Sequence, residues 1–107
     1  AFPVWLAPVQ ATIIPITDRH VDYANKVAQK LKEENIRIEV DDRNTTASAK
    51  IRNAELQKIP YILVVGDKEI KSKSVNVRVR GEKVLGPMSL NKFTTLITQD
   101  IDKKRQV

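Results

Sequence analysis

Few residues in this chain could carry catalytic chemistry. It has no cysteine, which excludes a thiolate nucleophile, a disulfide and a sulfur-ligated metal. His20 is the only histidine, and no serine or acidic residue has an evident sequence relation to it that would make it a general base. We therefore expect His20 to be a surface residue near the start of a helix. Asp41 and Asp42 could together bind Mg²⁺, but we interpret this pair as turn and cap residues.

Phosphate-binding loops are absent as well. The three glycines, Gly66, Gly81 and Gly86, match neither the G-x-G-x-x-G pattern nor the G-x-x-x-x-G-K-[ST] pattern. The sequence therefore predicts no catalytic residue, no metal site and no cofactor in this chain.

The excess of positive charge lies in the second half of the chain. Residues 1–42 hold 5 basic and 7 acidic side chains, whereas residues 43–92 hold 11 basic and 4 acidic ones, a net charge of +7. A solvated, lysine-rich surface would have this composition. A surface that binds a polyanion such as nucleic acid would have it too, and the charge alone leaves both interpretations open.

One segment carries basic residues in a regular pattern. From residue 74 to residue 80 valines alternate with polar residues, which is typical of a strand with one buried face. The other face would carry Asn76, Arg78 and Arg80, after a turn that holds Lys68, Glu69, Lys71 and Lys73. Arginine offers a planar fork of donors that matches a phosphate or a guanine edge, although exposed arginines also protect sheet edges. The face lacks aromatic residues, which leaves hydrogen bonding to a few splayed bases as the RNA-binding mode.

The elements that must position these residues follow from hydrophobic periodicity. Continuous or alternating apolar runs predict strands, and apolar residues at helical spacing predict helices. The strands are expected at 9–16, 36–40, 61–65, 74–80 and 84–85, and the helices at 18–34, 47–57 and from Ser89 onward. This order predicts an α/β fold, a three-layer mixed sheet of about five strands with a βαβαβ core, an antiparallel hairpin and three helices.

The length of 107 residues suits a single domain, which we place at residues 9–107. Residues 1–8 are apolar and bracketed by Pro3 and Pro8, so they should form an extended lead-in. We expect this segment to be a junction from a larger protein, in which Phe2, Trp5 and Leu6 pack against a neighbouring domain. An ordinary first strand on the domain's own core is the alternative. No apolar run approaches the roughly 20 residues that a membrane span needs, and we expect no membrane partner.

Several motifs resemble one protein family in unbroken order over nearly the whole chain. They are Phe2-Pro-Val-Trp-Leu-Ala-Pro-Val-Gln10, Ile16-Thr-Asp18, Asp42-Arg-Asn44, Lys50-Ile-Arg52, Gln57-Lys-Ile-Pro-Tyr61 and Val65-Gly-Asp-Lys-Glu69. The sequence resembles the C-terminal anticodon-binding domain of threonyl-tRNA synthetases, which are class II enzymes. In that family the opening segment is the junction from the catalytic core.

The resemblance implies a non-catalytic domain that recognises the anticodon loop of threonine tRNA. The bases it would recognise are the second and third of the anticodon, G and U. Binding would position the tRNA for aminoacylation by the parent ligase. The positions that match the family's base-contacting residues are Asn44, Arg52, Glu69 and Arg78. Lys50, Lys73 and Arg80 are possible phosphate contacts. One departure is the run Thr45–Ala49, which lacks the family's glycine before the second helix.

The resemblance also implies properties of a parent enzyme. It would use ATP, Mg²⁺ and a zinc ion in its catalytic domain, act in the cytoplasm and form a homodimer, with that domain packed on Phe2, Trp5 and Leu6. Two alternatives are the equivalent domain of a prolyl or glycyl enzyme, and a protein-interaction module of the same fold without RNA binding.

Overall fold

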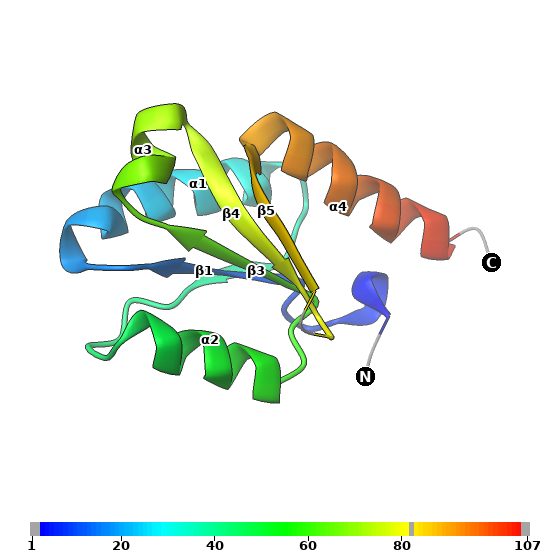
Figure 1. Cartoon of the computed structure of the whole chain (residues 1–107). Helices are drawn as coiled ribbons and strands as arrows, with labels where there is room; N and C mark the ends of the chain where they lie inside the picture. The colour runs from blue at the N-terminus through cyan, green and yellow to red at the C-terminus, as the bar shows by residue number, and fades with distance from the viewer. Residues whose placement is uncertain (1–2, 82, 106–107) are drawn as a thin grey trace.

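The computed structural model describes residues 3–81 and 83–105, and in this part of the chain five strands form one sheet with four α-helices packed around it (Figure 1). The strands are β1 (Ala11–Pro15), β2 (Ile38–Val40), β3 (Tyr61–Val65), β4 (Ser74–Val79) and β5 (Lys83–Ser89). The α-helices are α1 (Val21–Glu33), α2 (Ala47–Leu56), α3 (Asp67–Ser72) and α4 (Leu90–Arg105), and the 3₁₀-helices are η1 (Val4–Leu6) and η2 (Asp18–His20).

The sheet has the strand order β2-β1-β3-β4-β5. β1 pairs in parallel with both β2 and β3, whereas β4 pairs antiparallel with β3 and β5 antiparallel with β4. The predicted α/β class, with a parallel core and an antiparallel hairpin, is confirmed. Because the carboxyl ends of β1, β2 and β3 meet at one edge, the loops that follow these strands lie together there.

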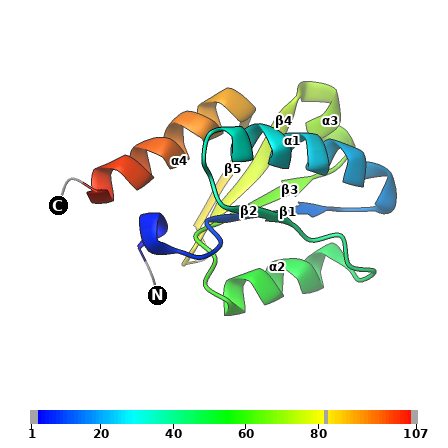
Figure 2. The same ribbon diagram turned by 180° about the vertical axis from the view of Figure 1, so that it is seen from behind.

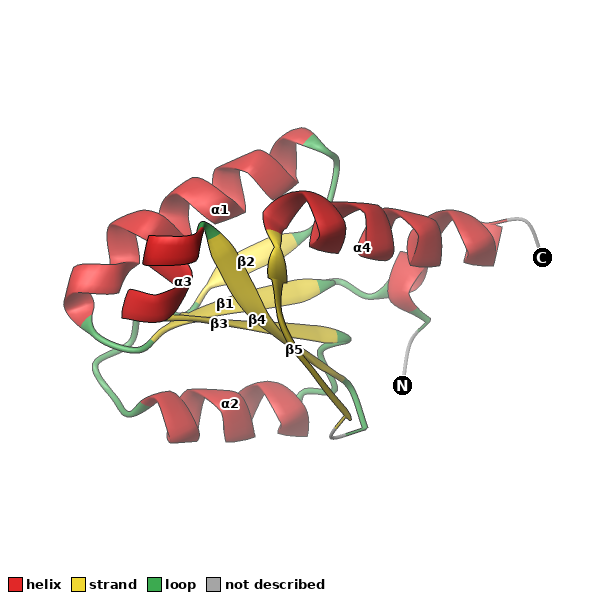
Figure 3. Ribbon diagram, turned by 45° about the horizontal axis from the view of Figure 1, so that its top comes forward, coloured by secondary structure: helices red, strands yellow, loops and turns green. Residues whose placement is uncertain are grey.

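Two hydrophobic layers hold the helices to the sheet (Figure 3). On one face α1 and α4 pack through Leu31 and Phe93 onto strand residues such as Leu63 and Val77. On the other face α2 packs through Ala54 in a smaller cluster, whose other buried members are Ile14, Ile59 and Ile62. The larger cluster supplies most of the buried apolar surface, so it dominates the hydrophobic stabilisation of the fold.

The face under α2 is only partly covered. The apolar residues of β1 and β3 on this face pack against α2, whereas β4 and β5 extend beyond the helix (Figure 1). Register puts Asn76 beside Val64 and Arg78 beside Ile62, so both polar side chains belong to this face. Val75 and Val77 on the opposite face are fully buried. The alternation predicted for this strand is therefore present, and it leaves an open strip beside α2.

The N-terminal segment packs onto the domain beside α4 (Figure 2). Val4 is buried in the larger core cluster, Trp5 is half-buried against it and Leu6 is exposed. The buried side chain of Gln10 donates to the Val4 carbonyl, and Arg37 donates to the carbonyls of Trp5 and Ala7. Of the three residues expected to pack on a neighbouring domain, Trp5 thus packs partly on this chain's own core and Leu6 is exposed, whereas Phe2 lies outside the described residues.

Two elements differ from the sequence prediction. A short helix, α3, stands at Asp67–Ser72 where a turn was expected, so the described residues contain four α-helices instead of three. β5 runs over Lys83–Ser89 instead of only Val84–Leu85, because Gly86 continues the strand through a bulge in the positive-φ region (φ 83°). Pro87 is tolerated there because β5 is an edge strand.

Candidate nucleic-acid interface

Arg78 is the predicted base-contacting residue that lies on a strand of the sheet. It is partly exposed on the strip that α2 leaves uncovered, and within the described residues its guanidinium has no hydrogen bond or ion pair. The bulge in β5 falls between the partners of Val77 and Arg78, where register shifts from Gly86 to Val84. The extra residue of the bulge is Leu85 in β5, so Arg78 lies where the local twist of the hairpin increases.

Arg52 faces the same strip from α2. Ile51 packs on the sheet, and an α-helix turns by about 100° per residue, so residues 50 and 52 lie on opposite flanks of α2. Lys50 and Asn53 line hollows on the β2 flank, which leaves the β4 flank to Arg52. Arg52 is exposed there. The structure thus brings two arginines to one uncovered part of the sheet.

Asn44 and Lys50 come together in a separate hollow of about 220 Å³, where β1 and β2 end and α2 begins. Thr46 caps α2 by accepting the Ala49 amide at 3.1 Å, which fixes the direction of the helix. Lys50 is 5% exposed, and its charge contributes to holding the pKa of Asp41 below its ordinary value. Carboxylates of Asp18 and Asp42 line the same hollow, so its charge is mixed rather than purely basic.

Glu69 is the most buried of the predicted base-contacting residues. It is 8% exposed, and its Oε1 accepts the Gly66 amide hydrogen at 2.8 Å, which caps the first turn of α3. Its charge also acts on Tyr23 of α1, whose pKa is raised mainly by burial and secondly by Glu69. Glu69 is therefore bonded within the first turn of α3, and no hydrogen bond or ion pair joins it to Arg78 among the described residues.

Lys73 lies away from the uncovered strip, and Arg80 lies in the turn that follows β4. Lys73 ends α3 in the left-handed region (φ 53°) and lines an open groove of about 510 Å³ between α1, α3 and the start of α4, together with Lys26 and Lys30. Arg80 acts electrostatically on Tyr61, which packs edge-on against Phe93 of α4 and donates to Asp100 at 2.7 Å. Lys73 therefore belongs to the layer on the opposite side of the sheet from Arg78.

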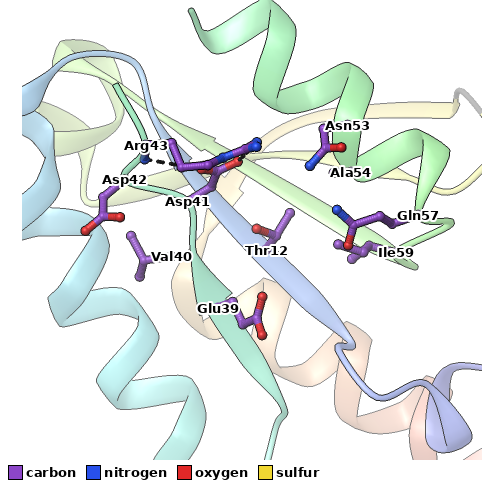
Figure 4. Close-up of a pocket in the computed structure, with 10 residues that line it drawn as sticks. All are labelled: Thr12, Glu39, Val40, Asp41, Asp42, Arg43, Asn53, Ala54, Gln57 and Ile59. Carbon is purple, nitrogen blue, oxygen red and sulfur yellow. Dashed lines mark hydrogen bonds and ion pairs between the residues drawn. The ribbon is translucent and has the colours of Figure 1, made fainter. Parts of the chain in front are cut away.

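A further polar hollow of about 310 Å³ lies between β2 and α2 (Figure 4). None of the predicted base-contacting residues lines it. Asp41 and Arg43 pair across it, with two contacts of 2.8 Å between the guanidinium and the carboxylate. The Arg43 hydrogen bonds hold the pKa of Asp41 below its ordinary value. This bond pattern is that of a turn, in agreement with the interpretation of Asp41 as a turn residue.

His20 is buried, which corrects the expectation of a surface residue. It is 3% exposed, its Nδ1 accepts the Thr17 amide hydrogen at 3.1 Å, and its Nε2 lies 2.8 Å from the Asp67 carboxylate. The sequence could not reveal this position, because Asp67 is 47 residues away in the chain. His20 is the functional candidate that sequence reasoning missed.

The described residues contain no group of three or more His, Cys, Asp or Glu side chains able to hold a metal ion. In residues 3–81 and 83–105 no helix combines the length and apolar character that a bilayer crossing requires.

Comparison with known proteins identifies the fold family. The model of the anticodon binding domain matches residues 10–100. The chain belongs to the anticodon binding domain family. It is 50% identical over 104 residues to a threonine–tRNA ligase of Caldanaerobacter subterraneus subsp. tengcongensis and 55% identical over 103 residues to one of Symbiobacterium thermophilum. These matches cover 97% and 96% of the chain, which spans only 16% of either relative.

Solved structures agree with the family. The RNA binding domain of threonyl-tRNA synthetase from Cryptosporidium parvum superposes with a TM-score of 0.87 at 28% identity, covering 92% of this chain and 25% of that one. Prolyl-tRNA synthetase from the same organism gives a TM-score of 0.83 at 29% identity, covering 94% and 22%. Class II synthetase domains of two amino-acid specificities thus share this arrangement of sheet and helices.

Proposed function

We propose that this chain is the anticodon-binding domain of a threonyl-tRNA synthetase and that it recognises the anticodon loop of threonine tRNA. The observation that carries the proposal is the guanidinium of Arg78, which lies on the uncovered strip of the sheet opposite the β5 bulge and has no hydrogen bond or ion pair to the described residues. Arginine donates two parallel hydrogen bonds to the O6 and N7 atoms of guanine, the second anticodon base. Anticodon bases are unpaired, so they can be splayed onto such a surface.

The other predicted residues take separate roles in this proposal. Arg52 faces the same strip and neutralises the RNA backbone next to the guanine. Asn44 and Lys50 offer amide and ammonium donors at their shared hollow, where the carbonyl oxygens of the third base, uracil, can accept. Glu69 keeps one carboxylate oxygen on Gly66, and the other oxygen is left to accept from guanine. Lys73 and Arg80 are more distant phosphate contacts.

The parent protein in this proposal is a cytoplasmic, homodimeric ligase that consumes ATP and threonine. Its catalytic domain packs on the N-terminal segment, through Trp5 and Leu6 and with Phe2 as a further contact. ATP, Mg²⁺ and zinc would all be bound by the catalytic domain of that parent protein.

A binding titration tests the proposal. The 107-residue chain is titrated with the anticodon stem-loop of threonine tRNA and with stem-loops whose second and third anticodon bases are changed, including GG and CC for the prolyl and glycyl alternatives. Tightest binding to the G-U stem-loop, weakening steeply as salt rises, is the expected result. Equal binding to all stem-loops would contradict the base readout. Absence of salt-dependent RNA binding would instead favour a protein-interaction module.

A further inference from the structure

The short helix α3 depends on contacts from outside itself. It has six residues, and isolated helices shorter than about 12 residues are marginal in water. The start of α1 supplies a contact at each end. The His20 ring lies 2.8 Å from the Asp67 carboxylate at the first residue of α3, and the Tyr23 hydroxyl donates at 2.8 Å to the Ser74 carbonyl just after the helix.

The orientation of His20 is itself fixed. Its Nδ1 accepts the Thr17 amide hydrogen, so the ring hydrogen of the neutral imidazole lies on Nε2, where Asp67 accepts it. Thr17 follows the end of β1, and Asp67 follows Gly66 after the end of β3. His20 therefore ties the loops that follow two neighbouring parallel strands.

Two side chains contact the Asp67 carboxylate, and they differ in burial. Arg19 contacts it at 2.6 Å, but both side chains are about two-thirds exposed, and exposed pairs contribute little because solvent screens them. The His20 ring is 3% exposed. The hydrogen bond from the buried ring is therefore the contact that orders Asp67.

Glu69 lies two residues beyond Asp67 in the same first turn. Its carboxylate holds the Gly66 amide, and Gly66 is pressed against Ile16, since a Cβ atom at residue 66 would lie 2.6 Å from the Ile16 Cδ1. The first turn of α3, which carries Glu69, thus packs against the loop after β1. The buried side chain that holds this turn in place is His20, through its bond to Asp67.

We infer that His20 is a positioning residue for base reading, which acts by holding Asp67 and so fixing the carboxylate of Glu69 at the edge of the sheet. This inference rests on the function proposed above. It adds a buried residue that touches no RNA to the set that determines the preference for guanine.

The test is the ratio of dissociation constants for stem-loops with A and with G at the second anticodon base. In His20→Gln, the amide oxygen can still accept the Thr17 hydrogen bond as in a capping box, but the ring nitrogen that contacts Asp67 is gone. We expect this ratio to fall by about threefold to tenfold. Arg19→Gln removes the exposed pair with Asp67 and a longer contact, 3.4 Å, from Arg19 Nε to the His20 ring, but it keeps the bond between His20 and Asp67 and should leave the ratio unchanged.

A double variant tests whether His20 changes the base preference through Glu69. If His20 acts through Glu69, adding His20→Gln to Glu69→Gln should not lower the ratio further. Ile97→Val, a core change in α4, is the control for lost stability and should keep the ratio of the unmodified chain. An equal fall in Ile97→Val, or a further fall in the double variant, would overturn the positioning role.

The outcomes separate this inference from the proposed function. If the unmodified chain prefers G and Arg78→Ala loses the preference while His20→Gln keeps it, only the inference fails. If the unmodified chain has no preference for G, the base readout fails and the inference fails with it.

Discussion

Lys50 and Arg52 leave α2 on opposite flanks of Ile51, although a single residue separates them in the sequence. Ile51 packs against the sheet, Lys50 is 5% exposed beside Asn44, and Arg52 is exposed on the flank that faces β4. The two cations of this short motif therefore lie at different places on the α2 face of the sheet: Lys50 at the hollow with Asn44, and Arg52 beside β4.

This geometry predicts different results for the two alanine variants. Arg52→Ala should weaken binding of every stem-loop and change the free energy of unfolding by no more than about 0.5 kcal/mol, because it is an exposed residue. Lys50→Ala should cost about 1–2 kcal/mol of folding stability, since its aliphatic stem is packed. Urea denaturation followed by circular dichroism measures both values. A strongly destabilised Arg52→Ala would place this side chain in the core instead.

Arg78→Ala should abolish most of the preference for G over A at the second anticodon base. A good bidentate base contact is worth about 1–3 kcal/mol of discrimination, which corresponds to roughly tenfold to hundredfold in relative affinity. Arg78→Lys keeps the charge but loses the planar fork, so it should restore overall affinity more than selectivity. Fluorescence titration with paired stem-loops gives the ratio. A ratio that stays intact in Arg78→Ala would show that this strand does not read the base.

Lys73→Ala should weaken all stem-loops about equally and leave the G-over-A ratio unchanged. Lys73 lies on the groove with Lys26 and Lys30, on the other side of the sheet from Arg78, so it is suited to a phosphate and not to the base. Loss of one phosphate contact should lower the slope of log affinity against log salt by roughly one. The slope is measured by repeating the titration at several salt concentrations. A change in base preference would contradict this assignment.

Asp41 should make the fold sensitive to acid. Hydrogen bonds from Arg43 hold the pKa of its carboxyl below the ordinary value of 3.8. The unfolded chain therefore takes up this proton first as the pH falls, so the stabilising contribution is complete above about pH 5 and is lost as the pH falls through the folded-state pKa. Asp41→Asn should flatten the fall in the free energy of unfolding between pH 5 and 3. Urea denaturation at several pH values measures it, and an unchanged slope would contradict the pairing.

Trp5 is the only tryptophan, so its fluorescence reports on the N-terminal segment. Its side chain is half-buried between the core and solvent. The emission maximum of the folded chain should lie between those of a fully buried indole and of the urea-unfolded chain, and a soluble quencher should reach it. Emission typical of a dry, buried indole would show that the segment is covered more completely than the structure indicates.

Most elements could be predicted from the sequence because their hydrophobic pattern is local. The continuous run at Tyr61–Val65 and the alternation at Ser74–Val79 each specify a strand by themselves, and the structure contains both. Helix α3 could not be predicted in this way, since Gly66 and Asp67 are typical turn residues and the helix depends on His20 and Tyr23. Its stability comes from residues more than 40 positions away in the sequence.

The candidate site shows the same division. Alternation indicated which face Arg78 occupies, because strand periodicity fixes it. Alternation does not fix the direction of Arg80, because β4 ends at Val79 and Arg80 lies in the turn that follows. The capping bond of Glu69 to Gly66 and the burial of His20 depend on how α3 sits on the sheet, and no local pattern carries that information.

The hydrogen bonds of Gln10 and Arg37 give the N-terminal segment a mechanical property. Three carbonyls of residues 4–7 accept hydrogen bonds from side chains that precede β1 and β2. The segment is therefore fixed rigidly to the domain. A polypeptide joined before this segment would move together with the domain as one rigid body. A movement of that polypeptide would therefore also move Glu69 and Asn44 at the opposite edge of the sheet. Loss of the Arg37 side chain would remove two of these three hydrogen bonds and allow the segment to rotate relative to the domain.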